Sequence, residues 1–441
     1  MLPERAGQAK PDFPTSSKSS ANSQLRLTRT SAEPYILNTS NPSRNDDCSR
    51  LERSRRLFFS QDNPLPARTP GIVPHNVHLY DFQAFACTSC GRCCRPWEVS
   101  LENVQRNAIE ASAAYQRRLR PGYLPITVET AGIGELGDRG DGHCTFLDEK
   151  NLCELHGEIG GRSKPMGCQL YPYQVVRTPA GTFAYLSFGC PPVVAGLDFD
   201  VSANRNELRE VLGDYAAPLE DSEESPFLVE LSAQTSIPWQ AYLRLEADLA
   251  TAFQSSQPIT SCLTFAANLL AWERTGKIDL ERRLSPEDLE FTLELLRKFL
   301  GSMISAVENI DEDSVRRELA LAVETGQSVV SERFGLTLPP LSTGEPEATW
   351  VLEVYSRYYR NALVGKAALR STLIARLYTM ACELILTSYY AEAFRLDRGL
   401  TALDLDCLTD AFGIVEFHHG IHSPAMGRFG LALEETFRTL T

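Results

Sequence analysis

The chain has 441 residues, of which 43% are hydrophobic, and its formal net charge is -14. This length exceeds one typical domain and the apolar content supplies a sizeable core, so we expect a folded protein of two domains with a tail. The first 75 residues hold 11 Lys and Arg against 7 Asp and Glu, so the remaining body, with 32 against 50, is strongly acidic. An acidic body argues against non-specific binding to nucleic acid or to an anionic membrane, and we expect neither as a partner.

The N-terminus lacks the apolar run of a secretory signal, and no later stretch reaches roughly 18 uninterrupted apolar residues. The most apolar stretch, residues 371–394, is interrupted by Arg376 and Glu383. We therefore expect a cytoplasmic protein. In that reducing compartment, clustered cysteines bind metal more often than they form disulfides.

Residues 1–75 are rich in Ser, Pro, Asn and Arg and show no sustained apolar period. Such a segment cannot bury enough apolar surface to offset the entropy lost on ordering. The sequence therefore predicts a disordered N-terminal tail.

Residues 76–198 are predicted to form a small, loop-rich, metal-binding domain, because eight of the chain's 12 cysteines fall between residues 87 and 190. Four of them lie within eight consecutive residues, which brings several thiolates to one point at little loop-closure cost. A soft metal centre needs that concentration of sulfur. The candidate metal ligands are Cys87, Cys90, Cys93, Cys94, Cys144, Cys153, Cys168 and Cys190.

Eight thiolates are enough for one four-thiolate site with thiols to spare, or for two sites. Adjacent Cys93 and Cys94 point in different directions from an extended backbone, so we expect them not to share one tetrahedral zinc ion. One of the two would then face a second centre. Zinc and an iron-sulfur cluster (4Fe-4S) both accept four thiolates, so the spacing leaves both cofactors open.

Regular structure in this domain is expected to be sparse. Residues 80–86 are predicted to be extended, and Ser100 is predicted to begin a helix that runs to Arg118. Residues 126–128 and 183–186 are predicted to form short strands. Residues 121–190 are otherwise rich in Gly and Pro. A loop-rich region of this length needs a cross-link, which a bound metal would supply.

Residues 199–441 are predicted to form an irregular helical bundle, so that the protein is mainly α. Ser285 is a capping residue followed by Pro286 at the first helical position, and apolar residues recur behind it at three- and four-residue steps. No repeat of a solenoid is evident. We expect seven or eight helices, with apolar stripes at 239–253, 262–272, 289–307, 315–330, 351–363, 369–394 and 403–417.

At the cysteines the sequence resembles the YkgJ-type cysteine-cluster family, whose domain is described as chelating zinc or iron and which includes the flagellin lysine-N-methylases (FliB). The family pattern is a CxxCxxCC-like start, a Cys followed by an apolar pair and Asp, a further Cys, and an Arg-Pro step leading to a Cys and an aromatic-Pro pair. The matching stretches are 87–94 with Trp97, 144–148, 153–157 and 164–172.

This resemblance covers about residues 80–195. Lys164 and Gln169 stand where the family usually has Arg, which leaves the thiolates untouched but argues against carrying over any anion-binding role of the two arginines. The methylase branch also has a helical half, with an aromatic segment that residues 355–360 resemble. The resemblance implies transfer of a methyl group from S-adenosylmethionine, as cofactor, to lysine side chains of flagellin, as protein substrate.

Three further patterns have simpler explanations than a functional site. Residues 132–137 match GxGxxG, but no helix follows that could face a phosphate, so a loop is the better interpretation. His143 and His156 could each replace a thiolate, although a position as loop residues merely adjacent to the cysteines is the favoured explanation. His418, His419 and His422 read as a solvated helix end.

Two classes of function remain open at this point. In one, the protein is an enzyme, a methylase-like or redox transferase whose cluster takes part in the reaction or holds the active site together. In the other, the metal is structural, and the helical half binds a partner. A structural zinc site has four protein ligands, whereas a catalytic site keeps a position open.

Overall fold

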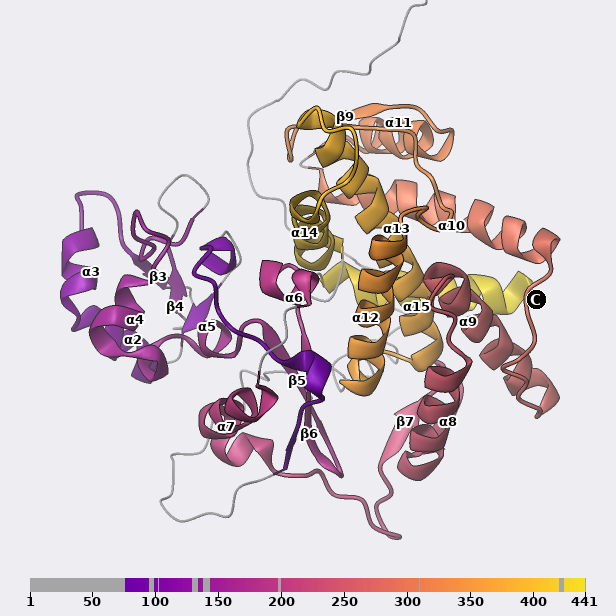
Figure 1. The fold of residues 1–441 in the computed structure, drawn as a ribbon, viewed down its shortest axis with the longest axis horizontal. Helices are drawn as coiled ribbons and strands as arrows, with labels where there is room; N and C mark the ends of the chain where they lie inside the picture. The colour runs from indigo at the N-terminus through magenta and orange to yellow at the C-terminus, as the bar shows by residue number, and fades with distance from the viewer. Residues whose placement is uncertain are drawn as a thin grey trace, which may run out of the picture.

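The computed structural model describes residues 76–94, 99–101, 103–128, 134–137, 143–196, 200–308, 310–419 and 424–440. The predicted disordered tail, residues 1–75, lies outside these ranges, as do Trp97 and His422. The described chain is mainly α-helical, as the sequence predicts, with only short sheets. Figure 1 shows a smaller lobe around α2, α3 and α4 beside a larger helical lobe.

The smaller lobe is built from short elements. Its three-stranded sheet has the order β2-β4-β3, with both pairs antiparallel. Short helices pack against it through a small apolar core that joins sheet and helix residues. The elements are β2 (Ser100–Leu101), α2 (Asn103–Glu110), α3 (Ala113–Arg118), β3 (Ile126–Val128), β4 (Gly134–Leu136) and α4 (Glu154–Ile159), with 3₁₀ turns η2 (Arg92–Cys94) and η3 (Gly161–Ser163).

A second sheet, β1-β6-β5, joins this lobe to the helices. Strand β1 (Val77–His78) pairs in parallel with β6 (Gly181–Leu186), which forms an antiparallel hairpin with β5 (Tyr173–Thr178). Every residue of β6 is buried, so both faces of the strand are covered. The turn η1 (Asp81–Gln83), α5 (Met166–Leu170) and α6 (Pro191–Ala195) complete this part.

The larger lobe is a bundle centred on α13 (Leu373–Asp397), which packs against α9, α14 and α15. Its other elements are α7 (Val201–Leu212), η4 (Gly213–Ala216), β7 (Leu228–Glu230), β8 (Ser236–Pro238), α8 (Trp239–Ala252), α9 (Pro258–Thr275), α10 (Pro286–Val307), α11 (Asp313–Glu324), β9 (Val329–Ser331), β10 (Leu336–Leu338), α12 (Thr349–Val364), η5 (Ala367–Arg370), α14 (Leu405–Ile414), the π-helix η6 (Val415–His419) and α15 (Pro424–Leu440).

Helix α13 is apolar on all sides, which is the pattern of a helix enclosed by others. Thr372 caps its N-terminus by accepting a hydrogen bond from the amide of Ala375. Its two buried charges are partnered, because Arg376 lies 2.8 Å from Glu383, which also accepts from the Tyr358 hydroxyl at 2.7 Å. The two charges that interrupt this apolar stretch of sequence are therefore paired with each other inside the bundle.

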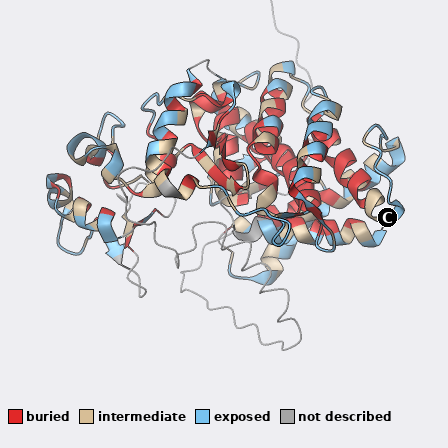
Figure 2. Cartoon of the chain, turned by 90° about the horizontal axis from the view of Figure 1, so that it is seen from below, coloured by how far each residue is buried: buried red, intermediate tan, exposed pale blue. Residues whose placement is uncertain are grey.

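Two apolar cores are present among the described residues. The main core takes residues from the β1-β6-β5 sheet, from α6 and from the later helices. The second lies within the smaller lobe and comprises Leu101, Ile109, Ala114, Ile126, Phe146 and Leu155. Buried residues accordingly gather in the helices of the larger lobe, and exposed and intermediate positions are more frequent in the smaller one (Figure 2).

Several predicted elements are confirmed. Ser285 caps α10 through the amide of Asp288, and residues 126–128 and 183–186 are strands. Others are wrong in detail. Ser100 lies in strand β2, and the expected helix is broken into α2 and α3, the latter capped by Ser112. The apolar stripe at 315–330 is helical only as far as Glu324, and strand β9 begins at Val329.

The expectation of a solvated histidine cluster is also wrong. His419 is buried, with its Nε2 atom 2.9 Å from the Tyr390 hydroxyl. Burial, followed by the charge of His418, lowers the pKa of His419 to about 3. The ring is therefore neutral in the folded protein, and its tautomer sets the direction of the hydrogen bond with Tyr390. No helix among the described residues has the length and apolar character needed to cross a bilayer.

The depressed pKa of His419 predicts a loss of stability in acid. The unfolded histidine takes up a proton as pH falls through about 6.5, whereas the folded one does so only near 3. Stability present above pH 6.5 is therefore lost toward lower pH, at about 1.4 kcal/mol per unit. Urea unfolding of wild type and His419→Gln at pH 5, 6 and 7 should show the stability difference between them shrinking as pH falls. A difference that stays constant with pH would contradict this.

Candidate metal centre

The first four cysteines lie on a tight turn whose backbone requires unusual torsions. Ser89 and Gly91 have φ of 54° and 73°, and the amide of Cys94 donates to the carbonyl of Gly91 at 3.0 Å. The amide of Ser89 also points at the sulfur of Cys87, 3.4 Å away. This contact orients the Cys87 sulfur atom within the turn.

Gly91 is needed for contact as well as for conformation. A Cβ atom at this position would lie 3.0 Å from the side chain of Asn151, which belongs to the turn just before Cys153. The CxxCxxCC turn therefore packs directly on the loop that carries a later cysteine. This contact brings thiols that are 60 residues apart in the chain into one region.

The structure corrects the expectation for Cys93 and Cys94. The backbone from Arg92 to Cys94 is a 3₁₀ turn, not an extended strand, and the two sulfur atoms lie 3.9 Å apart. A tetrahedral ion with Zn–S bonds near 2.3 Å has sulfur atoms about 3.8 Å apart. Adjacent side chains can therefore ligate one ion here. The sulfur–sulfur contact lowers the pKa of Cys93 to about 7 and raises that of Cys94.

Cys144, Cys153 and Cys168 approach this pair from separate segments. The amide of Cys144 donates to the carbonyl of Cys94 at 2.6 Å, and Cys153 forms a β-bridge with Leu147. Burial, with the nearby Cys153 and Cys93, raises the pKa of Cys144 to about 11. Burial also raises the pKa of Cys168, on α5, to about 12. Among neighbouring charges, that of Cys144 contributes most to this increase. A bound cation would remove this mutual repulsion.

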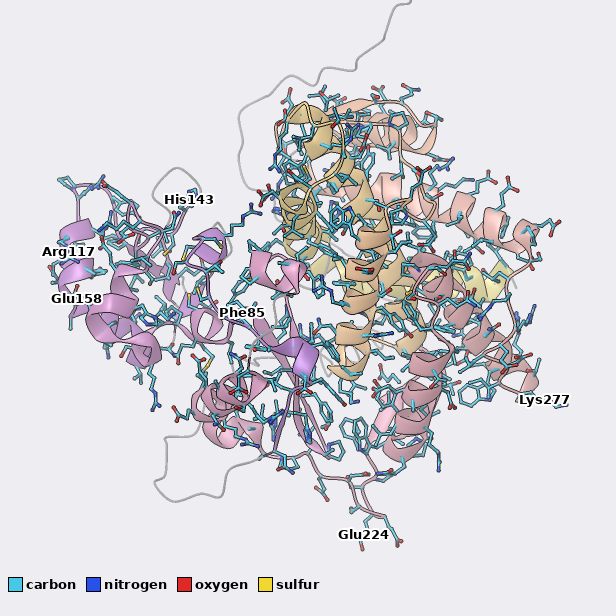
Figure 3. All side chains as sticks on the ribbon, viewed as in Figure 1. Phe85, Arg117, His143, Glu158, Glu224 and Lys277 are labelled. Atoms are coloured by element: carbon cyan, nitrogen blue, oxygen red, sulfur yellow. The ribbon has the colours of Figure 1, made fainter. Side chains whose placement is uncertain are left out.

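Cys190 reaches the cluster from the other side. It directly precedes α6 and is buried, and burial raises its pKa, with Cys90, Cys93 and Cys87 adding to the effect. All eight predicted ligands are therefore among the described residues, and each lies near others of the set. Figure 3 shows sulfur atoms, in yellow, in the region between His143 and Phe85.

The donor chemistry fits a soft metal, since thiols are the dominant titratable groups of this region and its described cysteines form no disulfide. The arrangement is nevertheless open. Among the described residues, no group of three or more His, Cys, Asp or Glu side chains is arranged so that it could hold a metal ion.

Side chains of the helical lobe hold the cysteine loops in place. Arg92, between Cys90 and Cys93, donates to Asp410 at 2.6 Å and to Asp406 at 3.3 Å, both on α14. Glu416 on η6 is buried and accepts from the Ser187 hydroxyl and from the amides of Phe188 and Gly189, at 2.8 and 3.0 Å for the amides. These contacts fix both ends of the cluster to one surface of the helical lobe.

A third contact comes from Arg357 on α12, which donates to the carbonyls of Val193 and Val194 at the end of α6. Sequence reasoning did not find Asp410, Glu416 or Arg357, which lie over 150 residues from the cysteines they support. Arg92 is the only one of these residues inside the motif.

The family comparison covers the same region. Residues 86–191 match the CxxCxxCC family, described as a "putative zinc- or iron-chelating domain". This match supports a cysteine-cluster domain that binds metal. Searches of curated proteins and of solved structures found no match to the chain.

The two positions where the cysteine-cluster domain departs from the family pattern have local roles. Gln169 donates to the carbonyls of Arg162 and Lys164, at 3.1 and 2.6 Å, and so closes the loop before α5. The charge of Lys164 favours the thiolates of Cys93 and Cys168. Lys164 thus still places a positive charge beside the cluster.

The two histidines near the cysteines differ in exposure. His156 is exposed on α4, while His143 is partly buried beside Cys144. Gly134 to Leu136 form strand β4 rather than a loop, and residues 132 and 133 lie outside the described ranges. Tyr355, Tyr358 and Tyr359, in the segment that resembles the methylases, are buried in the main core.

The contact at Gly91 generates a test. Gly91→Ala should lower the metal content of the purified protein, because the new methyl group displaces Asn151 and with it the loop leading to Cys153. Gly122→Ala is the matched control, since Gly122 also has a positive φ, 78°, but a Cβ there has nothing within 4 Å. In both variants the left-handed backbone costs about 1–2 kcal/mol of folding free energy, because alanine carries a Cβ atom. Equal metal content in the two variants would contradict this role of Gly91.

Proposed function

We propose that this chain is a metal-binding protein whose eight clustered cysteines hold zinc or an iron-sulfur cluster as thiolates. The observation that carries this proposal is the convergence of Cys87 to Cys94, Cys144, Cys153, Cys168 and Cys190 from separate segments. The positive charge of Lys164 supports it, because this charge favours the metal-binding thiolate form of Cys93 and Cys168.

The bound metal would act first as a cross-link. The smaller lobe has a second core of only six buried apolar residues and short helices, which is little to stabilise its loops. Metal ligation joins the CxxCxxCC turn, the 144–153 loop and α5 at one point, so that metal binding and folding of this lobe are coupled. The thiols close around the ion from the open arrangement described above.

Elemental analysis of anaerobically purified protein, with its absorption spectrum, tests this proposal. We expect bound zinc, or iron with sulfide and absorption near 400 nm. Cys168→Ser should lose metal and become protease-sensitive within residues 80–195, while the helical lobe keeps its circular dichroism. Cys262→Ser is the control, because Cys262 is buried in α9 away from the cluster. Wild-type protein without metal, or Cys168→Ser with full metal content, would refute the proposal.

Transfer of a methyl group from S-adenosylmethionine to a lysine of flagellin is the finer prediction, and it rests on the resemblance alone. The burial of Tyr355, Tyr358 and Tyr359 gives that segment a packing role, which favours the alternative of a non-catalytic metal site with a partner-binding helical lobe. Isothermal titration with S-adenosylmethionine separates the two. We expect no binding heat for the non-catalytic protein. Binding that is lost in the metal-depleted protein would support the methyltransferase.

A further inference from the structure

Lys366 is a buried lysine of the helical lobe, outside the cysteine region. It directly precedes the turn η5 and is 1% exposed, whereas Lys150 and Lys277 are exposed. Its ammonium nitrogen pairs with the carboxylate of Glu246 on α8. Burial lowers the pKa of Lys366 and raises the pKa of Glu246, so both shifts favour the uncharged form of the group. The uncharged amine is the form of lysine that acts as a nucleophile.

Aromatic rings surround the Lys366 nitrogen. The ring centres of Phe183, on β6, and of Tyr242 and Trp239, on α8, lie 4.4, 5.8 and 5.9 Å from it. Rings at these distances attract an ammonium group by cation–π interaction. Aromatic side chains beside a few polar groups are also the usual lining of a site for a small molecule. The surroundings of Lys366 therefore suit a compound with an apolar or aromatic substituent.

Three polar atoms near this ion pair are buried and, among the described residues, have no hydrogen-bond partner. They are Oε2 of Glu246 and the hydroxyl groups of Tyr242 and Tyr359. Both tyrosines are fully buried, and the charge of Glu246 adds to burial in raising the pKa of each. A buried polar group without a partner costs about 1–3 kcal/mol. Such groups beside one amine are the hydrogen-bonding groups that a polar ligand would use.

The backbone at Lys366 is strained. Its φ is 64°, in the left-handed region, which costs about 1–2 kcal/mol for a residue that carries a Cβ atom. The preceding residue, Gly365, has no room for a side chain, because a Cβ atom there would overlap the Cβ of Tyr185 on β6. Close packing of the chain on β6 thus imposes the conformation. Strain of this kind is concentrated at functional sites.

The ion pair is closest to solvent on the side of the carboxylate. The side chain of Glu246 is 10% exposed, whereas that of Lys366 is 2% exposed. Tyr80, which is 40% exposed, lies near enough for the charge of Glu246 to add to burial in raising the pKa of its hydroxyl. A small molecule that enters beside Tyr80 therefore meets the carboxylate first and the amine behind it.

We propose that Lys366 is the nucleophilic amine of a site for a small aldehyde or ketone with an apolar substituent, with Glu246 as its acid–base partner. Glu246 takes a proton from the ammonium, and the amine attacks the carbonyl carbon, so that a C–N bond forms and the π electron pair moves to oxygen. The hydroxyl groups of Tyr242 and Tyr359 bind this oxygen, which takes a second proton from the nitrogen. Glu246 returns its proton to the new hydroxyl group, which leaves as water, and an iminium on Lys366 remains paired with the carboxylate.

Reductive trapping in the full chain tests this proposal. Benzaldehyde forms an iminium with a reactive lysine, sodium cyanoborohydride reduces it to a benzylated amine, and peptide mass spectrometry locates the product. Lys366 should be benzylated at least about tenfold faster than Lys277, an exposed lysine labelled in Figure 3, and the difference should disappear in urea. A folded chain in which Lys366 is not benzylated would overturn the proposal.

Tyr359→Phe separates a reactive amine from a lysine with a purely structural role. It removes a hydroxyl group that has no partner among the described residues, so a structural role predicts an unchanged or higher melting temperature and unchanged labelling. Our proposal predicts that benzylation of Lys366 slows about tenfold while that of Lys277 stays the same. Tyr389→Phe is the matched control, because the Tyr389 hydroxyl is also buried without a described partner but belongs to α13. Equal labelling rates in the two variants would overturn the proposal.

Discussion

The structure depends on bringing together thiols that repel one another once they ionise. Burial and neighbouring thiolates raise the pKa of Cys144 and Cys168, while Cys93 ionises readily beside Cys94. A small lobe with a second core of six residues cannot offset that repulsion by apolar burial alone. A cation bound among the sulfur atoms would attract the thiolates, so that their mutual repulsion would be replaced by a cross-link between the loops.

The helical lobe contributes more than a scaffold beside this cluster. Its most enclosed helix, α13, supports α14 and η6, and these present Asp410 and Glu416 to the cysteine loops. The β1-β6-β5 sheet also takes part in the main core, so the segment that ends at Cys190 is anchored by apolar packing and by charge. Rigid elements of one lobe thus set the positions of ligands that belong to loops, as precise metal sites require.

Sequence reasoning was sufficient where one local rule dominates. The cap at Ser285, the apolar stripes and the short strands follow from spacing alone, and the cysteine spacing identified the cluster. It failed where tertiary contacts decide. Nothing local predicts a 3₁₀ turn at Cys93, which overturned the argument from an extended backbone. Burial of His419 depends on Tyr390, and Glu416 finds its partners more than 220 residues away.

The uneven exposure of the sulfur atoms has a consequence for redox chemistry. Oxidation of cysteine follows thiolate character and access, and Cys87 and Cys90 are the exposed members of the cluster. An oxidant such as peroxide therefore meets these two first. The sulfenic acid formed on one has the other three residues away, and condensation between them yields a disulfide and water. Among the described cysteines of the cluster, the two at the solvent-facing end of the turn are thus the most accessible to an oxidant.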